Sequence, residues 1–396
     1  MLIVFFSFQG IHKGEPEGVV KGILPIVESF DNQTLNKVVY YLGYVNGYKG
    51  IVNIRLLSKT YYVIARLINL INRTFTLIPY YKNRFINEVL YDFFASKKIT
   101  EPVILISSAY LPRTQRKNKL LGGVNLFVAG NPDDFEINEL LIKEQKKNDV
   151  LFNDAYTYNK RIKFISKSLF SYDHIVTFTV TEKESYSKRI QKEKVSFIES
   201  HIIPNTSAFP DLYFQKNNKI TFCFVAHPFW LKGLPYLLEA WSKINTSDIL
   251  LKVGGRIDNQ LQKIIANKYS NLQSVEYFGW VDNLNQFMRT SHVCIVPSLL
   301  DAGPATVAEA MICGLPVVVS EGCGARTLIK DNINGFIIPT GDANALAEKI
   351  NWFKSNPNNI LKMGKEATKT INELAKSDQN KRVAKHVIGI INSYKI

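Results

Sequence analysis

Short apolar runs alternate with helical patterns along the second half of the sequence, and this regularity limits the possible folds more than any other feature. The runs have the length and β-branched content of buried strands and read "ITFCFVA", "DILLKVGG", "LQSVEYFG", "HVCIVPS" and "LPVVVSE". The segments between them have helical spacing: "GLPYLLEAWSKI", "NQLQKIIANKY", "NLNQFMRT" and "ATVAEAMICG". Such alternation predicts a parallel sheet with helices on both faces. The second half is therefore expected to be a doubly wound α/β domain.

The first half repeats this alternation less regularly. Strands are expected at "LIVFFSF", "KVVYYLGYV", "VILISSA", "VNLFVAG" and "HIVTFTV", and helices at "VVKGILPIVESF", "FEINELLIKEQKK" and "YTYNKRIKFISKSLF". A polar stretch, "NTSAFPDLYFQKNNK", separates the halves, and 396 residues suffice for two cores. We expect Rossmann-like domains at residues 1–205 and 206–375, facing each other across a cleft. Terminal helices are expected at "ANALAEKINWFKS" and "ELAKSDQNKRVAKHVIGIINSY", with residues 376–396 able to pack back on the first domain.

The segment "PSLLDAGPATVAEAMICGLPVVVSEGCG", residues 297–324, places two carboxylates in an apolar, small-residue context. These are Asp301 and Glu309. A carboxylate accepts two hydrogen bonds and therefore suits the vicinal hydroxyls of a ribose or a hexose. The pair taken alone also fits an N-capping aspartate followed by a surface glutamate.

A helix start lies between the two carboxylates. Gly303 and Pro304 mark it, because proline is tolerated at the first position of a helix. The backbone N–H groups of Ala305 and Thr306 then have no intrahelical acceptor, and such a helix end suits a phosphate. The segment therefore predicts a phosphate site with a carboxylate on each side.

At this point the chain resembles the family four glycosyltransferases of the GT-B fold, the glycosyl transferases group 1. The resemblance runs through "FVAHPFWLKGLPYLLEAW", "LLKVGG", "YFGWVD", the 297–324 segment and "NGFIIPTGD", and covers most of residues 220–350. It places the family's E-x7-E motif on Asp301 and Glu309. The implied roles are contact with the transferred sugar for Asp301 and with the nucleotide ribose for Glu309.

The resemblance also implies a phosphate-binding pair, Lys232 with Gly233, at a strand-to-helix turn. Two positions depart from the family pattern. His227 stands where the family has an arginine, and Asp301 stands where it has a glutamate. His227 can donate to a phosphate oxygen, but its charge near pH 7 depends on its surroundings. Asp301 is one methylene shorter than glutamate, so it must lie closer to the sugar or select another hydroxyl.

The implied reaction is a retaining transfer of a hexose from a nucleotide diphosphate sugar to a glycan, lipid or small-molecule acceptor. Asp301 and Lys232 are the expected catalytic residues, and Lys232 would stabilise the leaving diphosphate. The scheme demands no metal and no cofactor besides the nucleotide sugar. A non-catalytic GT-B scaffold that retains the nucleotide site is the main alternative, and a sugar-nucleotide epimerase or a phosphorylase is another.

The first domain would bind the acceptor. Its loop "GIHKGEPEG" follows the first strand, which makes Gly10 and Gly14 candidate contacts, although a plain flexible turn fits equally well. The closest acidic pair elsewhere, Asp133 with Asp134, is not a D-x-D motif and is expected to mark a helix start.

The net charge of +15 is concentrated in residues 35–130, which hold 14 Lys and Arg against 3 acidic residues. An anionic lipid carrier or membrane surface is one expected partner of this region, and a solvated basic face is the alternative. No nucleic-acid motif is present, so no nucleic-acid partner is expected. The first residues lack the pattern of a signal peptide, which predicts a cytoplasmic protein with optional peripheral contact at the inner membrane face.

The cysteines and histidines predict no metal site. The 4 cysteines match no zinc or redox spacing, and their apolar contexts predict small buried hydrophobes. The 6 histidines have no metal-binding spacing.

Overall fold

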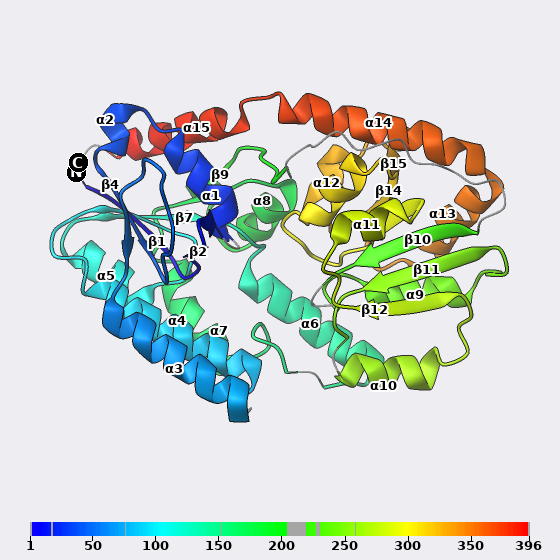
Figure 1. Ribbon diagram of the computed structural model, residues 1–396. Coiled ribbons are helices and arrows are strands. Elements are labelled where there is room, and N and C mark those ends of the chain that lie inside the picture. Colours follow the sequence, from blue (N-terminus) through cyan, green and yellow to red (C-terminus); the bar gives the residue numbers. More distant parts are fainter. Residues whose placement is uncertain are drawn as a thin grey trace. The chain divides into compact units, whose positions relative to one another are not determined.

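The computed structural model describes residues 2–16, 19–75, 77–151, 153–203, 219–226, 230–257 and 259–394. The chain divides into two units (Figure 1). The first unit comprises Met1–Phe178, Glu182–Ser200 and Asp378–Ile396, and the second comprises Thr179–Thr181 and His201–Ser377. The divisions therefore fall after residues 200 and 377, where the sequence suggested 205 and 375.

The first unit contains a parallel sheet in the order β5-β4-β1-β6-β7-β8-β9. Its strands are β1 (Ile3–Ser7), β4 (Val38–Leu42), β5 (Ile54–Leu56), β6 (Ile104–Ser107), β7 (Val124–Val128), β8 (His174–Thr177) and β9 (Val195–Phe197). The central strand β1 is buried along its whole length, which explains its uninterrupted apolar sequence. The strand order reverses between β1 and β6, and such switch points are where open α/β sheets bind ligands.

Helices cover both faces of this sheet. They are α1 (Val19–Glu28), α2 (Asn32–Leu35), α3 (Lys59–Phe75), α4 (Tyr80–Ser96), α5 (Pro112–Leu120), α6 (Asp134–Asn148), α7 (Asn159–Leu169), α8 (Val180–Ser187) and α15 (Gln379–Ser393). Ile3 and Phe5 of β1 pack into a cluster with α1 and α15, and Val4 and Phe6 pack with α3 and α4 on the other face. The last helix, α15, thus completes the core of the first unit, and Figure 1 shows it in red beside the blue α1.

The second unit contains a parallel sheet in the order β12-β11-β10-β13-β14-β15. Its strands are β10 (Ile220–Val225), β11 (Ile249–Gly254), β12 (Val275–Gly279), β13 (Val293–Val296), β14 (Val317–Ser320) and β15 (Gly335–Ile338). Its helices are α9 (Leu234–Ser242), α10 (Asn259–Lys268), α11 (Leu284–Arg289), α12 (Ala305–Ile312), α13 (Ala343–Ser355) and α14 (Pro357–Ala375). Both units are therefore doubly wound and Rossmann-like, as expected, and here the order reverses between β10 and β13.

The end of the chain differs from the expectation of one helix over "ELAKSDQNKRVAKHVIGIINSY". The first residues of that segment belong to α14, which ends at Ala375, and a new helix begins at Gln379. Asp378 caps α15, because its carboxylate accepts a hydrogen bond from the Lys381 N–H at 3.2 Å. None of the helices in the described ranges is long and apolar enough to cross a membrane.

Candidate functional site

Lys232 and Asp301 meet at the switch point of the second sheet. Lys232 follows β10 and Asp301 follows β13, and the Lys232 Nζ donates to the Asp301 Oδ2 in a salt bridge. The two side chains are 24% and 8% exposed. The Gly303 N–H donates to the Asp301 Oδ1 at 3.3 Å, and the Ser298 hydroxyl lies 3.4 Å from Oδ2. The two residues predicted to be catalytic are thus in direct contact at the edge where a ligand is expected.

The backbone around Asp301 is fixed by the segment that follows β14. The Asp301 N–H donates to the Gly322 carbonyl at 3.0 Å, and the Gly324 N–H donates back to the Asp301 carbonyl at 2.9 Å. A Cβ on Gly324 would overlap the Ala302 carbonyl oxygen, and one on Gly322 would overlap that of Leu299. These two glycines hold the Asp301 loop in place, and the sequence analysis did not identify them. The "EGCG" spacing directly after a strand was the available signal.

Gly233 has a backbone reason to be glycine. Its φ of 78° lies in the left-handed region, and it forms the N-cap of α9. A Cβ there would overlap the carbonyl oxygen of Pro297, just after β13. The Leu299 N–H donates to the Leu231 carbonyl at 2.7 Å across the same junction. The close approach of the two loops that Gly233 permits is what brings Lys232 to Asp301.

The helix α12 begins at Ala305, the first residue of the expected helical segment "ATVAEAMICG", and Pro304 lies just outside it. Pro304 is its N-cap, with φ −63° and ψ 123°, and Ala305 is the first helical residue. The expectation that proline occupies the first helical position was therefore wrong, because the extended ψ of Pro304 keeps it outside the helix. Ala305 and Thr306 are half-buried and occupy the first turn. Their N–H groups are those that an α-helix leaves without an intrahelical acceptor.

Glu309 lies in the middle of α12 and is half-buried. Burial raises the pKa of the Cys313 thiol to about 11, and the nearby Glu309 carboxylate adds to this shift. Cys313 is the C-cap residue of the same helix, four residues after Glu309. His227, the remaining predicted residue of this site, lies outside the described residues.

The loop with Gly10 and Gly14 forms an ordered β-hairpin. β2 (Ile11–His12) pairs with β3 (Glu15–Pro16), and the turn residues Lys13 and Gly14 have φ values of 50° and 88°. Two positive φ values are typical of the tight type I′ turn. Gly10 is buried against the Tyr44 carbonyl, where a Cβ does not fit. Both glycines thus have a backbone role in shaping this hairpin.

A pocket of about 670 Å³ lies at the switch point of the first sheet. It is lined by residues that follow β1, β4, β6 and β7 and by the facing sides of α3 and α4. Aromatic rings and amides dominate the lining, which includes Phe8, Gln9, Tyr44, Tyr61, Tyr62, Asn69, Tyr80, Asn83, Asn87, Tyr110, Asn131, Tyr156 and Tyr186. Rings with hydroxyls beside planar amides provide both apolar faces and hydrogen-bonding groups. Such a lining suits a polar organic ligand such as a saccharide.

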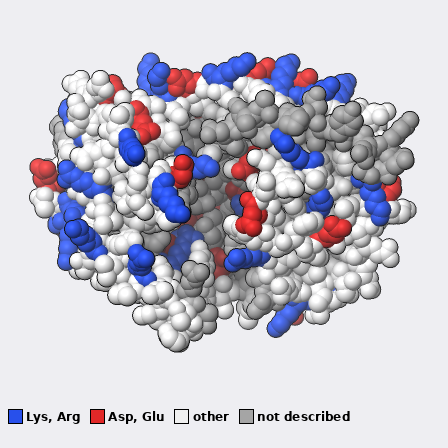
Figure 2. Space-filling model, viewed as in Figure 1, with Lys and Arg blue, Asp and Glu red and all other residues white. Residues whose placement is uncertain are grey.

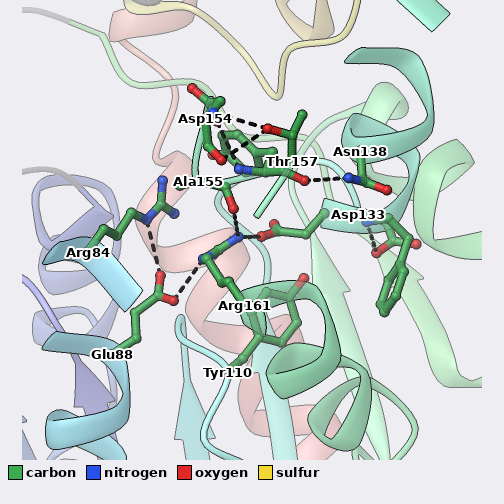
Figure 3. A network of polar contacts seen from close by, with 12 residues as sticks. Arg84, Glu88, Tyr110, Asp133, Asn138, Asp154, Ala155, Thr157 and Arg161 are labelled. Atoms are coloured by element: carbon green, nitrogen blue, oxygen red, sulfur yellow. Dashed lines mark hydrogen bonds and ion pairs between the residues drawn. The ribbon is translucent and has the colours of Figure 1, made fainter. Parts of the chain in front are cut away.

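A charged network forms one wall of this pocket (Figure 3). The guanidinium of the buried Arg161 donates to the Glu88 Oε2 at 2.7 Å and to the Asp134 Oδ2 at 2.6 Å. The Arg84 Nε donates to the other oxygen of Glu88 at 3.1 Å. Two arginines thus balance two carboxylates, and Arg161 also lies over the Tyr156 ring. The network ties α4, α6 and α7 together at the pocket.

Asp133, beside this network, caps α6. Its carboxylate accepts a hydrogen bond from the Phe135 N–H at 3.2 Å, so the expected helix start is confirmed. Burial raises its pKa to about 7, although the Arg189 Nε lies 3.1 Å from its Oδ2. The four cysteines are reduced and buried, as expected of small hydrophobes. Within the described ranges no three His, Cys, Asp or Glu side chains gather as a metal site.

Comparison with known proteins finds similarity over the part of the chain that contains Lys232, Asp301 and Glu309. Residues 210–370 match the family described as glycosyl transferases group 1. An uncharacterized glycosyltransferase of Haemophilus influenzae is 27% identical over 214 residues, which are 52% of this chain and 60% of the relative. The N,N'-diacetylbacillosaminyl-diphospho-undecaprenol alpha-1,3-N-acetylgalactosaminyltransferase of Campylobacter jejuni is 23% identical over 224 residues, 52% of this chain and 59% of the relative. The chain thus spans about 60% of the length of these curated relatives.

The likeness of fold extends over the whole chain. The crystal structure of Anabaena HepE in complex with UDP-glucose superposes with a TM-score of 0.59 at 13% identity, covering 98% of this chain and 99% of that one. The likeness over the whole chain shows that this protein has the GT-B fold, and within it residues 210–370 match the glycosyl transferases group 1.

Proposed function

We propose that this protein transfers a hexose from a nucleotide diphosphate sugar to a saccharide-bearing acceptor with retention of configuration. The observation that carries the proposal is the contact between Lys232 and Asp301 at the switch point of the second sheet, next to the first turn of α12. A cation, a carboxylate and a helix N-terminus are the groups that a diphosphate sugar requires. The Anabaena protein of the same fold was crystallised with UDP-glucose, which supports this class of donor.

The Lys232–Asp301 salt bridge suggests how donor binding prepares the site. A diphosphate carries more charge than one carboxylate, so it competes with Asp301 for the Lys232 ammonium. Once Lys232 turns to the diphosphate, the Asp301 carboxylate is released to accept hydrogen bonds from the sugar hydroxyls. Cleavage of the glycosyl–phosphate bond leaves negative charge on the diphosphate, which Lys232 and the N–H groups of Ala305 and Thr306 stabilise. His227 and Gly233 complete the phosphate site.

Glu309 holds the nucleotide ribose in this scheme, and Asp301 holds the transferred sugar. The reaction uses no metal ion and no cofactor besides the nucleotide sugar, because Lys232 and the helix N-terminus already supply the positive charge for the leaving group.

The acceptor side is proposed to be the pocket of the first unit. Its rings and amides provide apolar faces for sugar C–H groups and partners for sugar hydroxyls. The name of the Campylobacter relative specifies an acceptor linked through a diphosphate to undecaprenol. We therefore propose a glycan on a lipid carrier as the acceptor, with peripheral contact of the protein at an anionic membrane on the cytoplasmic side.

A non-catalytic nucleotide-binding scaffold is the second candidate. It is favoured by two departures from the family pattern. Asp301 has a shorter side chain than the family's glutamate, and His227 does not carry the permanent charge of the family's arginine. A scaffold would bind the nucleotide and release no sugar, so a transfer assay separates the two functions.

The experiment is a thermal shift series with UDP-, GDP- and ADP-sugars, because a ligand that binds the folded state raises the melting temperature. One nucleotide is expected to stabilise the wild type. Glu309→Gln should lose this stabilisation, whereas Asp301→Asn should keep most of it and lose transfer. Failure of every nucleotide at millimolar concentration would contradict the proposal, and equal loss of nucleotide binding in both variants would contradict the separate roles.

A further inference from the structure

The helix α3 presents a row of apolar side chains to solvent. Val63, Leu67, Leu70 and Ile71 are 47–58% exposed. Their spacing places them on one side of the helix, because an α-helix turns through about 100° per residue. We call these four residues the outer face of α3. Exposed apolar rows of this kind are uncommon on a surface that meets only water.

The opposite side of α3 forms a wall of the pocket in the first unit. Tyr61, Tyr62, Ala65, Arg66 and Asn69 line the pocket from this helix, with Arg66 at the rim next to the basic edge described below. Their mean direction around the helix axis is about 150° from that of the outer face, at about 100° of rotation per residue. The helix therefore separates the proposed acceptor pocket from its own outer face.

A basic edge runs between these two sides. Lys59 and Arg66 are spaced by seven residues, which places them on the same edge, and Arg73 continues the spacing in the sequence. The helix contains no acidic residue. In Figure 2 the lower rim of the first unit, where Figure 1 places α3, is mainly white, and blue side chains gather farther up around α5. An apolar row beside a basic edge is the pattern of a helix that lies in a membrane interface.

The charges favour a lipid surface over a second copy of this chain. Two copies of α3 packed through their outer faces would bring their basic edges together with no carboxylate on either helix. An anionic bilayer satisfies both features, because its headgroups take the basic edge and its acyl boundary takes the apolar side chains.

We propose that the outer face of α3 docks the protein on an anionic lipid bilayer. The side chains of Leu67 and Leu70 enter the boundary between headgroups and acyl chains, and Lys59 and Arg66 contact the headgroups. Since the other side of α3 lines the pocket, docking brings that pocket to the membrane surface, where the saccharide end of a lipid-linked acceptor is presented. This inference rests on the proposed function, which includes peripheral contact with an anionic membrane, and it names the surface that makes that contact.

Vesicle flotation tests the proposal with the full chain. We expect the protein to float with phosphatidylcholine vesicles that contain phosphatidylglycerol, to bind pure phosphatidylcholine more weakly, and to dissociate in high salt. Leu67→Glu with Leu70→Glu should weaken binding by roughly tenfold or more, because it places charge at the apolar boundary. The matched control is Leu151→Glu with Phe170→Glu, two exposed apolar residues elsewhere in the first unit, and it should bind as the wild type does.

The outcomes separate this inference from the proposed function. Nucleotide stabilisation is measured on the same samples, and the outer-face variant should retain it. A wild type that binds no anionic vesicle, or a control that loses as much as the variant, would overturn the docking surface while leaving the donor site intact. If the wild type is a dimer and the Leu67→Glu, Leu70→Glu double variant is a monomer, the outer face of α3 is an interface between two copies of the chain. That result would overturn the proposed docking on lipid. If the double variant is unfolded by circular dichroism, Val63→Ser with Lys59→Gln replaces it under the same criteria.

Discussion

The contact between Lys232 and Asp301 predicts a measurable coupling between the two side chains. Removing one partner of a buried ion pair costs roughly 3–5 kcal/mol, because the other charge stays buried. Lys232 keeps 24% of its side chain exposed, so water can replace part of the lost contact. We therefore expect Lys232→Met to cost about 2 kcal/mol and Asp301→Asn about 1 kcal/mol. In the double variant neither charge remains unpaired, so its loss should be about 1 kcal/mol smaller than the sum of the single losses.

Tryptophan fluorescence during urea unfolding measures this coupling in the correct unit. All four tryptophans, at positions 230, 241, 280 and 352, belong to the second unit. Lys243, at the C-cap of α9, and Glu239, within α9, form a more exposed pair in the same unit and provide the control. Lys243→Met should cost no more than about 0.5 kcal/mol. If the losses of Lys232→Met and Asp301→Asn simply add, and each is as small as the control, the salt bridge and the site built on it are refuted.

Two further predictions concern the first unit. Asp133 has a pKa raised to about 7, so between pH 4 and 7 the folded state binds more protons than the unfolded state and stability falls as pH rises. Asp133→Asn removes this pH-dependent contribution to stability, which is on the order of 4 kcal/mol. We therefore expect the unfolding free energy of the variant, minus that of the wild type, to be higher at pH 8 than at pH 5. Arg161→Met leaves the Glu88 and Asp134 carboxylates buried together, which should cost about 3–5 kcal/mol in thermal unfolding followed by circular dichroism. Adding Glu88→Gln and Asp134→Asn should restore much of that loss.

The second unit was the more predictable half because most of its strands, although not the largely exposed β12, are buried on both faces. Every strand expected between residues 220 and 321 is present, since burial on both faces makes a strand continuously apolar in sequence. The Lys232–Gly233 turn and the start of α12 could be placed within a residue for the same reason. The roles of Gly322 and Gly324 could not, because the carbonyls that exclude a side chain there come from a different loop.

The helices α4 and α5 of the first unit were not predicted, because the signals that define them are contacts between separate segments of the chain. The helix α4 carries buried Asn87 and Asp92, which obscure its apolar period. Asp92 accepts hydrogen bonds from the N–H groups of Arg113 and Thr114 at 2.9 and 3.0 Å and so caps α5 from another helix. The N-cap position of α5 itself is a leucine, which gives no helix-start signal in the sequence. The pocket of the first unit was missed because many separate segments contribute to it, none with a motif of its own.

The central claim is that Lys232 belongs to a nucleotide diphosphate site, and calorimetric titration tests it most directly. UDP, GDP and ADP are titrated separately into wild type, Lys232→Met and Lys243→Met. The account predicts that one nucleotide binds the wild type at one site per chain, that Lys243→Met binds it equally well, and that Lys232→Met binds it roughly tenfold more weakly or worse. Equal affinity of Lys232→Met and wild type, or no binding of any of the three at millimolar concentration, would contradict the account.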